Sequence, residues 1–459
     1  MIMSATSPAA TPTPAPRKNV TVIGAMAIGV GGMMGAGVYT LLGLSASIAG
    51  VWIPIAFAIG GLVSAFSVYS YAKLGARYPS RGGAGEFLVR CFGDGLISGG
   101  LNVFQFLGWI IAMSLYAVGF GGYASGFIPG APDWVGKAFG LGLIVIIVLV
   151  NMVGSGLVSK SEMIVVAIEL VILAVFVGFA ASHVDPGVFT HAADSAGGID
   201  FLSILFAAGL LYVTYEGFGV VTNSAANMAN PAKQLPRAMY AALAIVILIY
   251  VVLSAAVVMI LSVPEMTAND GHVLAEAARH IMGPVGFALL AAAALLATAS
   301  AVNATLFGDA NLSYMMASRG EIPADFQRGI WRGGKVGLFI AAALTMLFVA
   351  VFPLSAVGQM ASLAFLLIYG SVSVGHFRIR KKTGAKGWML VIAAGLNFAL
   401  FALLLGYTIA QGHTGTWITL LAVIVVAIVA EYAYRRKTGR TMKAAPVAAA
   451  ATAGATPTK

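Results

Sequence analysis

Three acidic residues, Glu169, Glu216 and Asp309, stand inside long apolar runs of this 459-residue chain. An ionisable side chain at bilayer depth costs several kcal/mol and generally serves a function, such as a proton relay or a counter-ion. A carboxyl group in such a place is stabilised either by holding a proton or by pairing with a cation. The chemistry that these residues suggest is therefore the movement of a proton or of a cationic group.

Glu169 and Asp309 differ in their expected depth. Glu169 lies about seven residues, or about 10 Å of helix, from the end of its run, and we expect it to alternate between protonated and ionised states. Thr298 and Ser300 are its candidate hydrogen-bond partners. The alternative is a permanently protonated glutamic acid bonded to a neighbouring carbonyl group. Asp309 comes late in its run, so we expect it to be solvated or salt-bridged.

Two of the apolar runs are interrupted by glycine and polar residues. The first has five glycines within the nine residues 29–37. The second reads Tyr215-Glu-Gly-Phe-Gly219 and continues through the polar residues 222–224. Each glycine weakens a helix by about 1 kcal/mol relative to alanine, so both stretches are expected to lose their helical hydrogen bonds part-way along. Irregular backbone inside a membrane is tolerated where protein shields it or where it lines a cavity.

The two interruptions occur at matching places in the two halves of the first ten expected helices. That arrangement is typical of an inverted repeat with a binding site at its interface. A broken helix offers free N–H groups to a carboxylate and free carbonyl groups to an ammonium group. The pair therefore favours a zwitterionic or amine-bearing ligand. The alternative is close helix packing through small residues such as Gly31 and Gly35.

Glu216 adjoins the second interruption, and three roles remain open for it. The first is an ion pair with a cationic group of the substrate, and the second is proton coupling. In the third, the carboxyl group bonds orphan amides at the break without touching a ligand.

The elements that must position these residues are membrane-spanning helices. The chain is 60% hydrophobic and only 9% charged, whereas soluble domains carry roughly a quarter charged residues. Many of its apolar runs reach the roughly 20 residues that cross a hydrocarbon core about 30 Å thick. The predicted division is a disordered tail at 1–18, a first inverted repeat at 19–182, a second at 200–375, two further helices within 387–434 and a second tail at 441–459.

Basic residues gather on every second connection between these helices. All of the 26 lysines and arginines except Lys137 and Arg279 fall on one side. The positive-inside rule makes that side cytoplasmic, with both termini inside. The net charge of +10 is therefore explained by membrane orientation, and no nucleic acid is expected as a partner. The single cysteine, Cys91, has no disulfide partner and is expected at a surface or an interface.

Short motifs that follow one another along the chain resemble the amino acid-polyamine-organocation (APC) transporter superfamily. They are Gly35-Ala-Gly-Val-Tyr39, Tyr71-Ala-Lys-Leu-Gly-Ala-Arg77 with Gly82-Gly83, Gly217-Phe-Gly219 with Asn230-Pro231 and Leu235-Pro-Arg-Ala238, and Ala317-Ser-Arg-Gly-Glu-Ile-Pro323. The resemblance implies an all-α polytopic membrane protein of twelve transmembrane helices. Its fold would be a LeuT-like five-plus-five inverted repeat with two additional C-terminal helices. The nearest pattern is the proton-coupled bacterial and archaeal amino acid permease branch.

The resemblance also implies roles at the two interruptions. Backbone amides of the first-helix motif would receive a substrate carboxylate, and carbonyl groups near Met33 and Tyr215 would receive its amine. Phe218 would form a gate over the substrate. The implied substrate-binding set is Met33, Gly35, Ala36, Gly37, Tyr215, Glu216, Gly217, Phe218 and Gly219.

In the proton-coupled branch, a lysine of helix five is thought to carry the proton. The matching position in this chain is Glu169, which departs from that pattern. The proton-coupling set that we expect here is therefore Glu169 with Thr298 and Ser300.

The sequence thus predicts a secondary active transporter in the inner cell membrane that takes up an amino acid with a proton by alternating access. The expected partners are that small substrate, which a cationic amino acid would also suit, the proton and the lipid bilayer. No cofactor, metal or enzymatic activity is expected. Two transport alternatives are a polyamine or inorganic cation carrier and an amino acid exchanger. An alternative from another class is a membrane-embedded sensor or enzyme.

Overall fold

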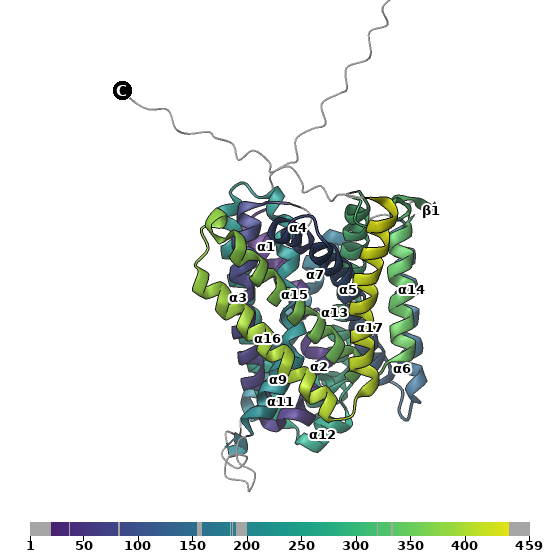
Figure 1. Cartoon of the computed structure of the whole chain (residues 1–459). Helices are drawn as coiled ribbons and strands as arrows, with labels where there is room; N and C mark the ends of the chain where they lie inside the picture. Colours follow the sequence, from purple (N-terminus) through teal and green to yellow (C-terminus); the bar gives the residue numbers. More distant parts are fainter. Residues whose placement is uncertain are drawn as a thin grey trace, which may run out of the picture.

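The computed structural model describes residues 20–35, 37–80, 83–153, 158–183, 185, 187–189, 200–318, 320–331 and 334–439. Nearly all of the described elements are helices, and the long ones lie side by side as a bundle (Figure 1). Ten runs of helix within these residues are long and apolar enough to cross a membrane. The predicted all-α membrane class is confirmed, whereas the count of twelve spans and the inverted repeat stay predictions.

The first part of the described chain contains seven α-helices. They are α1 (Val22–Met34), α2 (Gly37–Ala49), α3 (Ile53–Arg77), α4 (Gly83–Phe92), α5 (Leu96–Ser125), α6 (Asp133–Val153) and α7 (Val158–Ala180). The N-terminus of α1 is capped by Thr21, whose hydroxyl group accepts a hydrogen bond from the Gly24 amide at 3.1 Å. Such a cap satisfies an amide that has no partner within the helix.

Helix six is divided into short pieces. It comprises α9 (Phe201–Leu211), a 3₁₀ segment (Tyr212–Tyr215), α10 (Phe218–Val221) and a second 3₁₀ segment (Thr222–Asn227). The elements that follow are α11 (Pro231–Ile260), α12 (Val263–Ala268), α13 (Val273–Ser318), α14 (Val336–Val351), α15 (Leu354–Thr383), α16 (Gly387–Ala410) and α17 (Thr414–Thr438). A small hairpin of β1 (Gly329–Trp331) and β2 (Gly334–Lys335) precedes α14. Within α13, Gly283 takes φ +65° just before Pro284. Proline disfavours helical backbone at the residue before it, and glycine is the residue that accepts a positive φ without strain.

One end of the bundle is basic. The last turns of α15 and α17 both carry basic residues, and α4 packs against α15 at the same end. Figure 1 shows α12 at the opposite end from α4. We call the end with α4 the basic face; the sequence predicts that it is cytoplasmic.

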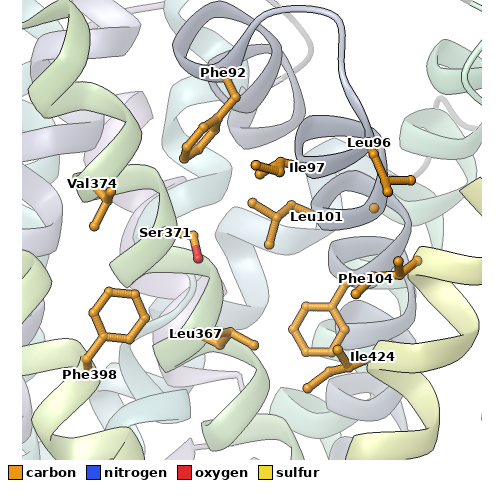
Figure 2. A pocket seen from close by; sticks show the side chains of 12 residues that line it. Phe92, Leu96, Ile97, Leu101, Phe104, Leu367, Ser371, Val374, Phe398 and Ile424 are labelled. Carbon is orange, nitrogen blue, oxygen red and sulfur yellow. The ribbon is translucent and has the colours of Figure 1, made fainter. Parts of the chain in front are cut away.

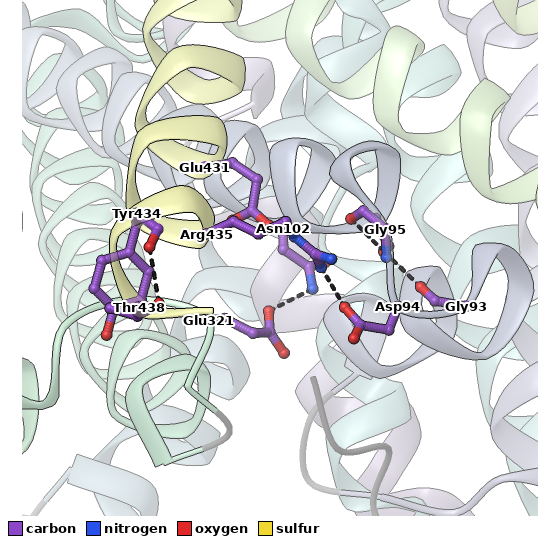
Figure 3. Close-up of polar contacts among 10 residues, drawn as sticks. Gly93, Asp94, Gly95, Asn102, Glu321, Glu431, Tyr434, Arg435 and Thr438 are labelled. Carbon is purple, nitrogen blue, oxygen red and sulfur yellow. Dashed lines mark hydrogen bonds and ion pairs between the residues drawn. The ribbon is translucent and has the colours of Figure 1, made fainter. Parts of the chain in front are cut away.

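A polar cluster at the basic face fastens α17 and the segment after α13 to the start of α5 (Figure 3). Arg435 of α17 binds Asp94, and it also bonds Glu431 at 3.3 Å. The Glu431 side chain is almost fully buried. Nearby, the buried Asn102 amide donates a hydrogen bond to Glu321 Oε2 at 2.7 Å. Helices that enter the bundle late in the sequence are therefore anchored to an early one through charged groups.

Cys91 is buried inside α4, so the prediction of a thiol at a surface or an interface is wrong. Its side chain packs where α4 meets α15, and a Cβ at Gly375 would lie 2.7 Å from Cys91 Cβ. Burial raises the pKa of the thiol to about 12, although the nearby Arg378 guanidinium acts in the opposite direction. The thiol is therefore protonated near neutral pH.

Replacing Arg435 with glutamine is expected to destabilise the protein by about 1–3 kcal/mol, because the buried Glu431 loses a charge-assisted hydrogen bond. Thermal unfolding of the purified protein in detergent measures the effect. The matched control is Arg436→Gln, which removes an exposed charge that forms no ion pair among the described residues. Equal melting temperatures for the two variants would contradict this role.

Candidate functional site

The two glycine-rich stretches lie against each other, backbone to backbone. A Cβ at Gly217 would fall 2.1 Å from the carbonyl carbon of Gly32 and 2.4 Å from the Met33 amide nitrogen. A Cβ at Gly37 would fall 2.5 Å from Thr214 Cβ. Neither position leaves room for a side chain. Helix one, which comprises α1 and α2, therefore meets helix six at the two glycine-rich stretches that were predicted to interrupt these helices.

The interruptions are milder than complete unwinding. Gly35 keeps right-handed helical angles (φ −51°, ψ −21°), and its amide bonds Gly31 O at 3.0 Å. Ala36 lies outside the described residues. In helix six, Glu216 and Gly217 also keep right-handed angles, and the Glu216 amide bonds the carbonyl group three residues before it. In this conformation the Gly35 amide is already used within α1, so its contact with a substrate carboxylate stays a prediction.

Tyrosine hydroxyl groups occupy carbonyl groups at both interruptions. Tyr250 of α11 donates to Met33 O at 2.6 Å and also lies 3.3 Å from Thr214 O. Tyr369 of α15 donates to Glu216 O at 2.9 Å. Carbonyl groups near a helix end need such partners when no water is at hand, and a buried tyrosine hydroxyl needs one as well. The Met33 carbonyl group, which was expected to receive the substrate amine, is held by Tyr250.

The Glu216 carboxyl group lies at the centre of this site. It is 1% exposed, and Tyr116 of α5 donates a hydrogen bond to its Oε1 at 2.5 Å. Its Oε2 has no hydrogen-bond partner among the described residues. No described lysine or arginine forms an ion pair with it. One carboxyl oxygen is thus left for a proton or for a donor group of a ligand.

Glu169 lies on α7, which packs against α1 and α13. It is 2% exposed, and the hydroxyl groups of Tyr39 and Tyr250 are near enough to interact with it electrostatically. Tyr39 and Glu169 do not meet hydrogen-bond geometry, since Tyr39 Oη and Glu169 Oε1 both lack a partner within the described part of the chain. The expected partner Thr298 instead donates to Ala294 O at 2.6 Å within its own helix. Ser300 lies on the same helix, partly buried.

Phe218 is fully buried among aromatic rings. Its centroid lies 5.5 Å from that of Tyr71, edge to face, and 4.8 Å from that of Tyr369. Tyr71 in turn meets Phe87 of α4 at 5.6 Å. This aromatic group joins the Glu216 turn to α3, α4 and α15. Phe218 is therefore placed on the side of the turn that leads to the basic face, and its role as a gate stays a prediction.

Tyr116, Tyr250 and Tyr369 were missed by reasoning from the sequence. The available signal was their position in the middle of apolar runs, because tyrosine in membrane helices is enriched at the interfaces instead. A buried hydroxyl group in mid-membrane indicates a specific acceptor nearby.

Asp309 departs from its prediction. It is 2% exposed, and neither of its carboxyl oxygens has a hydrogen-bond partner among the described residues. The prediction of a solvated or salt-bridged carboxylate is therefore wrong. The reason is packing, since the long helix α13 is covered by α5, α7 and α14.

Comparison with known proteins decides which family has this arrangement. The model of a family described as "Amino acid permease" matches residues 20–430. The chain belongs to the amino acid permease family. An uncharacterised protein of Methanocaldococcus jannaschii is 31% identical over 433 residues, which cover 92% of this chain and 97% of that protein.

Two further relatives of this permease have names that describe transport. The inner membrane transport protein YbaT of Escherichia coli is 32% identical over 414 residues, or 88% of this chain and 94% of the relative. The branched-chain amino acid permease BcaP of Bacillus subtilis is 22% identical over 440 residues, or 89% and 91% of the two chains. The permease is therefore a multi-pass membrane transporter and not an enzyme, and its predicted place in the APC superfamily is confirmed.

The contact between Gly32 and Gly217 predicts that the same substitution has different effects at the two glycines. Gly217→Ala is expected to lower the melting temperature and to reduce transport about tenfold, because overpacking against backbone costs about 1–3 kcal/mol. Gly32→Ala is the matched control, since its Cβ would meet Gly217 Cα and O at 3.4 Å, an ordinary contact. Uptake of a labelled amino acid mixture into proteoliposomes, divided by the amount of folded protein, measures both. Equal activities would show that this contact does not matter.

Proposed function

We propose that this permease takes up an amino acid together with a proton by alternating access. The observation that carries the proposal is the buried Glu216 carboxyl group. Tyr116 bonds one of its oxygens, and the other has no hydrogen-bond partner in the part of the chain that the structure describes. A buried carboxyl group without a basic partner is stabilised by a proton or by the ammonium group of a ligand. The family supports an amino acid as the substrate, as does the name of the branched-chain amino acid permease among its relatives.

In this proposal the substrate binds beside the contact between helix one and helix six. Amides around residues 35–37 receive its carboxylate, and the carbonyl groups of Met33 and Tyr215 receive its amine. The Tyr250 hydroxyl group, which now bonds Met33 O, is displaced when the amine arrives. Main-chain dipoles recognise the amino and carboxylate groups that all amino acids share. Selectivity for the side chain of the substrate is therefore assigned to the protein residues around that side chain, Phe218 among them.

Glu169 is the proposed proton carrier. Tyr250 links it to the substrate site, because α11, which carries Tyr250, packs against α7, which carries Glu169, and the Tyr250 hydroxyl group bonds the carbonyl group at the end of α1. When Glu169 gains or loses a proton, the energy of the hydrogen bond from Tyr250 to Met33 O is therefore proposed to change. The substrate amine must replace this bond when it binds. Thr298 and Ser300 on α13 are proposed to join this site when helix one moves during the cycle.

The basic face is proposed to be cytoplasmic, with both termini on that side of the inner membrane. Positively charged connections are retained on the cytoplasmic side, and the Escherichia coli relative is named an inner membrane transport protein. The substrate would then leave past Phe218, which lies between the Glu216 turn and this face.

Replacing Glu169 with glutamine is expected to abolish the stimulation of uptake by a pH gradient, because the amide cannot bind and release a proton. Exchange between equal pools of labelled and unlabelled substrate is expected to remain, since it needs no net proton movement. Uptake into proteoliposomes with and without an alkaline interior measures the difference. Asp325→Asn, which removes an exposed carboxylate, is the matched control and should keep the wild-type response.

Two results would argue against this function. Undiminished stimulation of the Glu169→Gln variant by the gradient would exclude Glu169 as the carrier. Uptake by the wild type that occurs only into vesicles preloaded with an amino acid would favour exchange. One relative that supports this alternative is the serine/threonine exchanger SteT of Bacillus subtilis, which is 24% identical over 312 residues.

Replacing Glu216 with glutamine is expected to raise the KM of the substrate about tenfold, because a neutral amide binds an ammonium group less strongly than a carboxylate does. Tyr116→Phe is expected to have a smaller effect of the same kind, because it removes one hydrogen bond to the carboxyl group while the carboxyl group itself remains. Tyr407→Phe on α16, outside the site, is the control for loss of a hydroxyl group. Initial uptake rates over a panel of neutral and cationic amino acids measure KM.

The pattern across that panel separates the open roles of Glu216. A loss confined to cationic amino acids indicates pairing with the substrate side chain. A loss of the pH response indicates proton coupling at Glu216. Unchanged KM and unchanged pH response would exclude both roles.

A further inference from the structure

A hollow of about 330 Å³ lies away from the substrate site, between α5, α15, α16 and α17 (Figure 2). Apolar side chains make up nearly all of its lining, and Ser371 supplies the one hydroxyl group there. It contains none of the residues that contact Glu216 or Glu169.

The hollow is open toward the membrane. Leu96, Ile97 and Val374, which line it, are 39%, 61% and 42% exposed, and on membrane helices such surface faces hydrocarbon. Along α15 it extends from Leu367 to Val374, or about 10 Å of helix. Figure 2 shows Ile97 near one end and Phe398 near the other. Because α15 is one of the helices long and apolar enough to cross a membrane, this extent runs in the direction of the lipid chains.

A free positive charge lies at the end of the hollow nearest the basic face. Arg378 follows Val374 by one turn of α15, and its guanidinium carbon lies 5.7 Å from the ring centroid of Phe92, a lining residue. Arg378 is exposed and forms no ion pair among the described residues. The segment 378–386 has five basic residues and no acidic one. By contrast, Arg435 on the α17 side is already paired with Asp94 and Glu431.

We propose that this hollow binds one acyl chain of a membrane phospholipid whose anionic phosphate headgroup pairs with Arg378. The apolar lining suits the chain, and a guanidinium group binds phosphate through two parallel hydrogen bonds. Anionic lipids also gather at basic segments beside the membrane. The bound lipid holds α16 and α17 against α5 and α15, where the hollow leaves protein contacts incomplete. A second copy of the chain fits less well, because a concave space of this size admits only a protruding side chain.

Native mass spectrometry of the full-length purified protein tests the charge that the proposal assigns to the headgroup. Phosphatidylglycerol and phosphatidylcholine are the two probes, and the wild type is expected to retain the anionic lipid preferentially. Arg378→Gln should lower that preference about fivefold, the effect of one basic residue at a membrane surface. Lys233→Gln removes a charge from the start of α11, which does not line the hollow, and should leave the preference unchanged.

Substitutions that fill the hollow test whether the lipid binds there. A Cβ at Gly100, a lining residue, would meet Ile428 Cγ1 at 3.5 Å, an ordinary contact, so a side chain can begin at this position without a clash. Gly100→Leu is expected to lose the retained lipid while keeping proteoliposome uptake, and Gly100→Ala to keep both. Ser371→Leu fills the same space from α15 and replaces Gly100→Leu if that variant does not fold. Retention by a filled variant with the wild-type preference, equal retention of the two lipids by the wild type, or a dimer in place of the lipid adduct would overturn the proposal.

Discussion

The direct contact of main-chain atoms at Gly32 and Gly217 is the constraint on which the rest of the site depends. No side chain separates helix one from helix six there. The carbonyl groups beside the contact therefore find no hydrogen-bond donor among the side chains of the two glycines. Donors must come from other helices, and Tyr250 and Tyr369 supply them. The same contact places the Glu216 turn against helix one, so that a carboxyl group, freed carbonyl groups and aromatic rings share a small buried volume.

A carbonyl group that accepts a hydrogen bond from a tyrosine hydroxyl group can later accept one from a ligand instead. It costs little to exchange one donor for another, whereas a bare carbonyl group in a dry interior would cost several kcal/mol. Met33 O illustrates the point, since Tyr250 bonds it and the amine of the proposed substrate would make the same kind of bond. The tyrosines therefore stabilise the empty state without closing the site to a ligand. The mild 3₁₀ distortion of helix six is sufficient for this purpose, because only a few carbonyl groups need to be available.

Features that depend on local sequence could be predicted, and features that depend on distant neighbours could not. The helical membrane class follows from composition and run length, and the meeting of the two glycine-rich stretches follows from their matching positions. Asp309 and Cys91 were placed wrongly because their burial is decided by other helices that pack against them, α5, α7 and α14 in the case of α13 and α15 in the case of α4. The bond from Tyr116 to Glu216 joins residues 100 positions apart. The degree of unwinding was overestimated because the tertiary packing of helix six outweighs the weak helix propensity of glycine.

In the proposed cycle, coupling between proton and substrate needs no long pathway. Coupling requires an element with two arrangements whose equilibrium both ligands bias. In the proposal that element is Tyr250, which is either bonded to Met33 O, as in this structure, or released from it by the substrate amine. Tyr250 lies on α11, which packs against α7, the helix of Glu169, and its hydroxyl group bonds the end of α1, which is the segment that must move if helix one rocks. A change in charge at Glu169 and an amine at Met33 therefore act on one hydroxyl group. In this cycle a glutamate serves in helix five, where the related branch has a lysine, because the proposed requirement is a titratable charge beside Tyr250 and not a charge of particular sign.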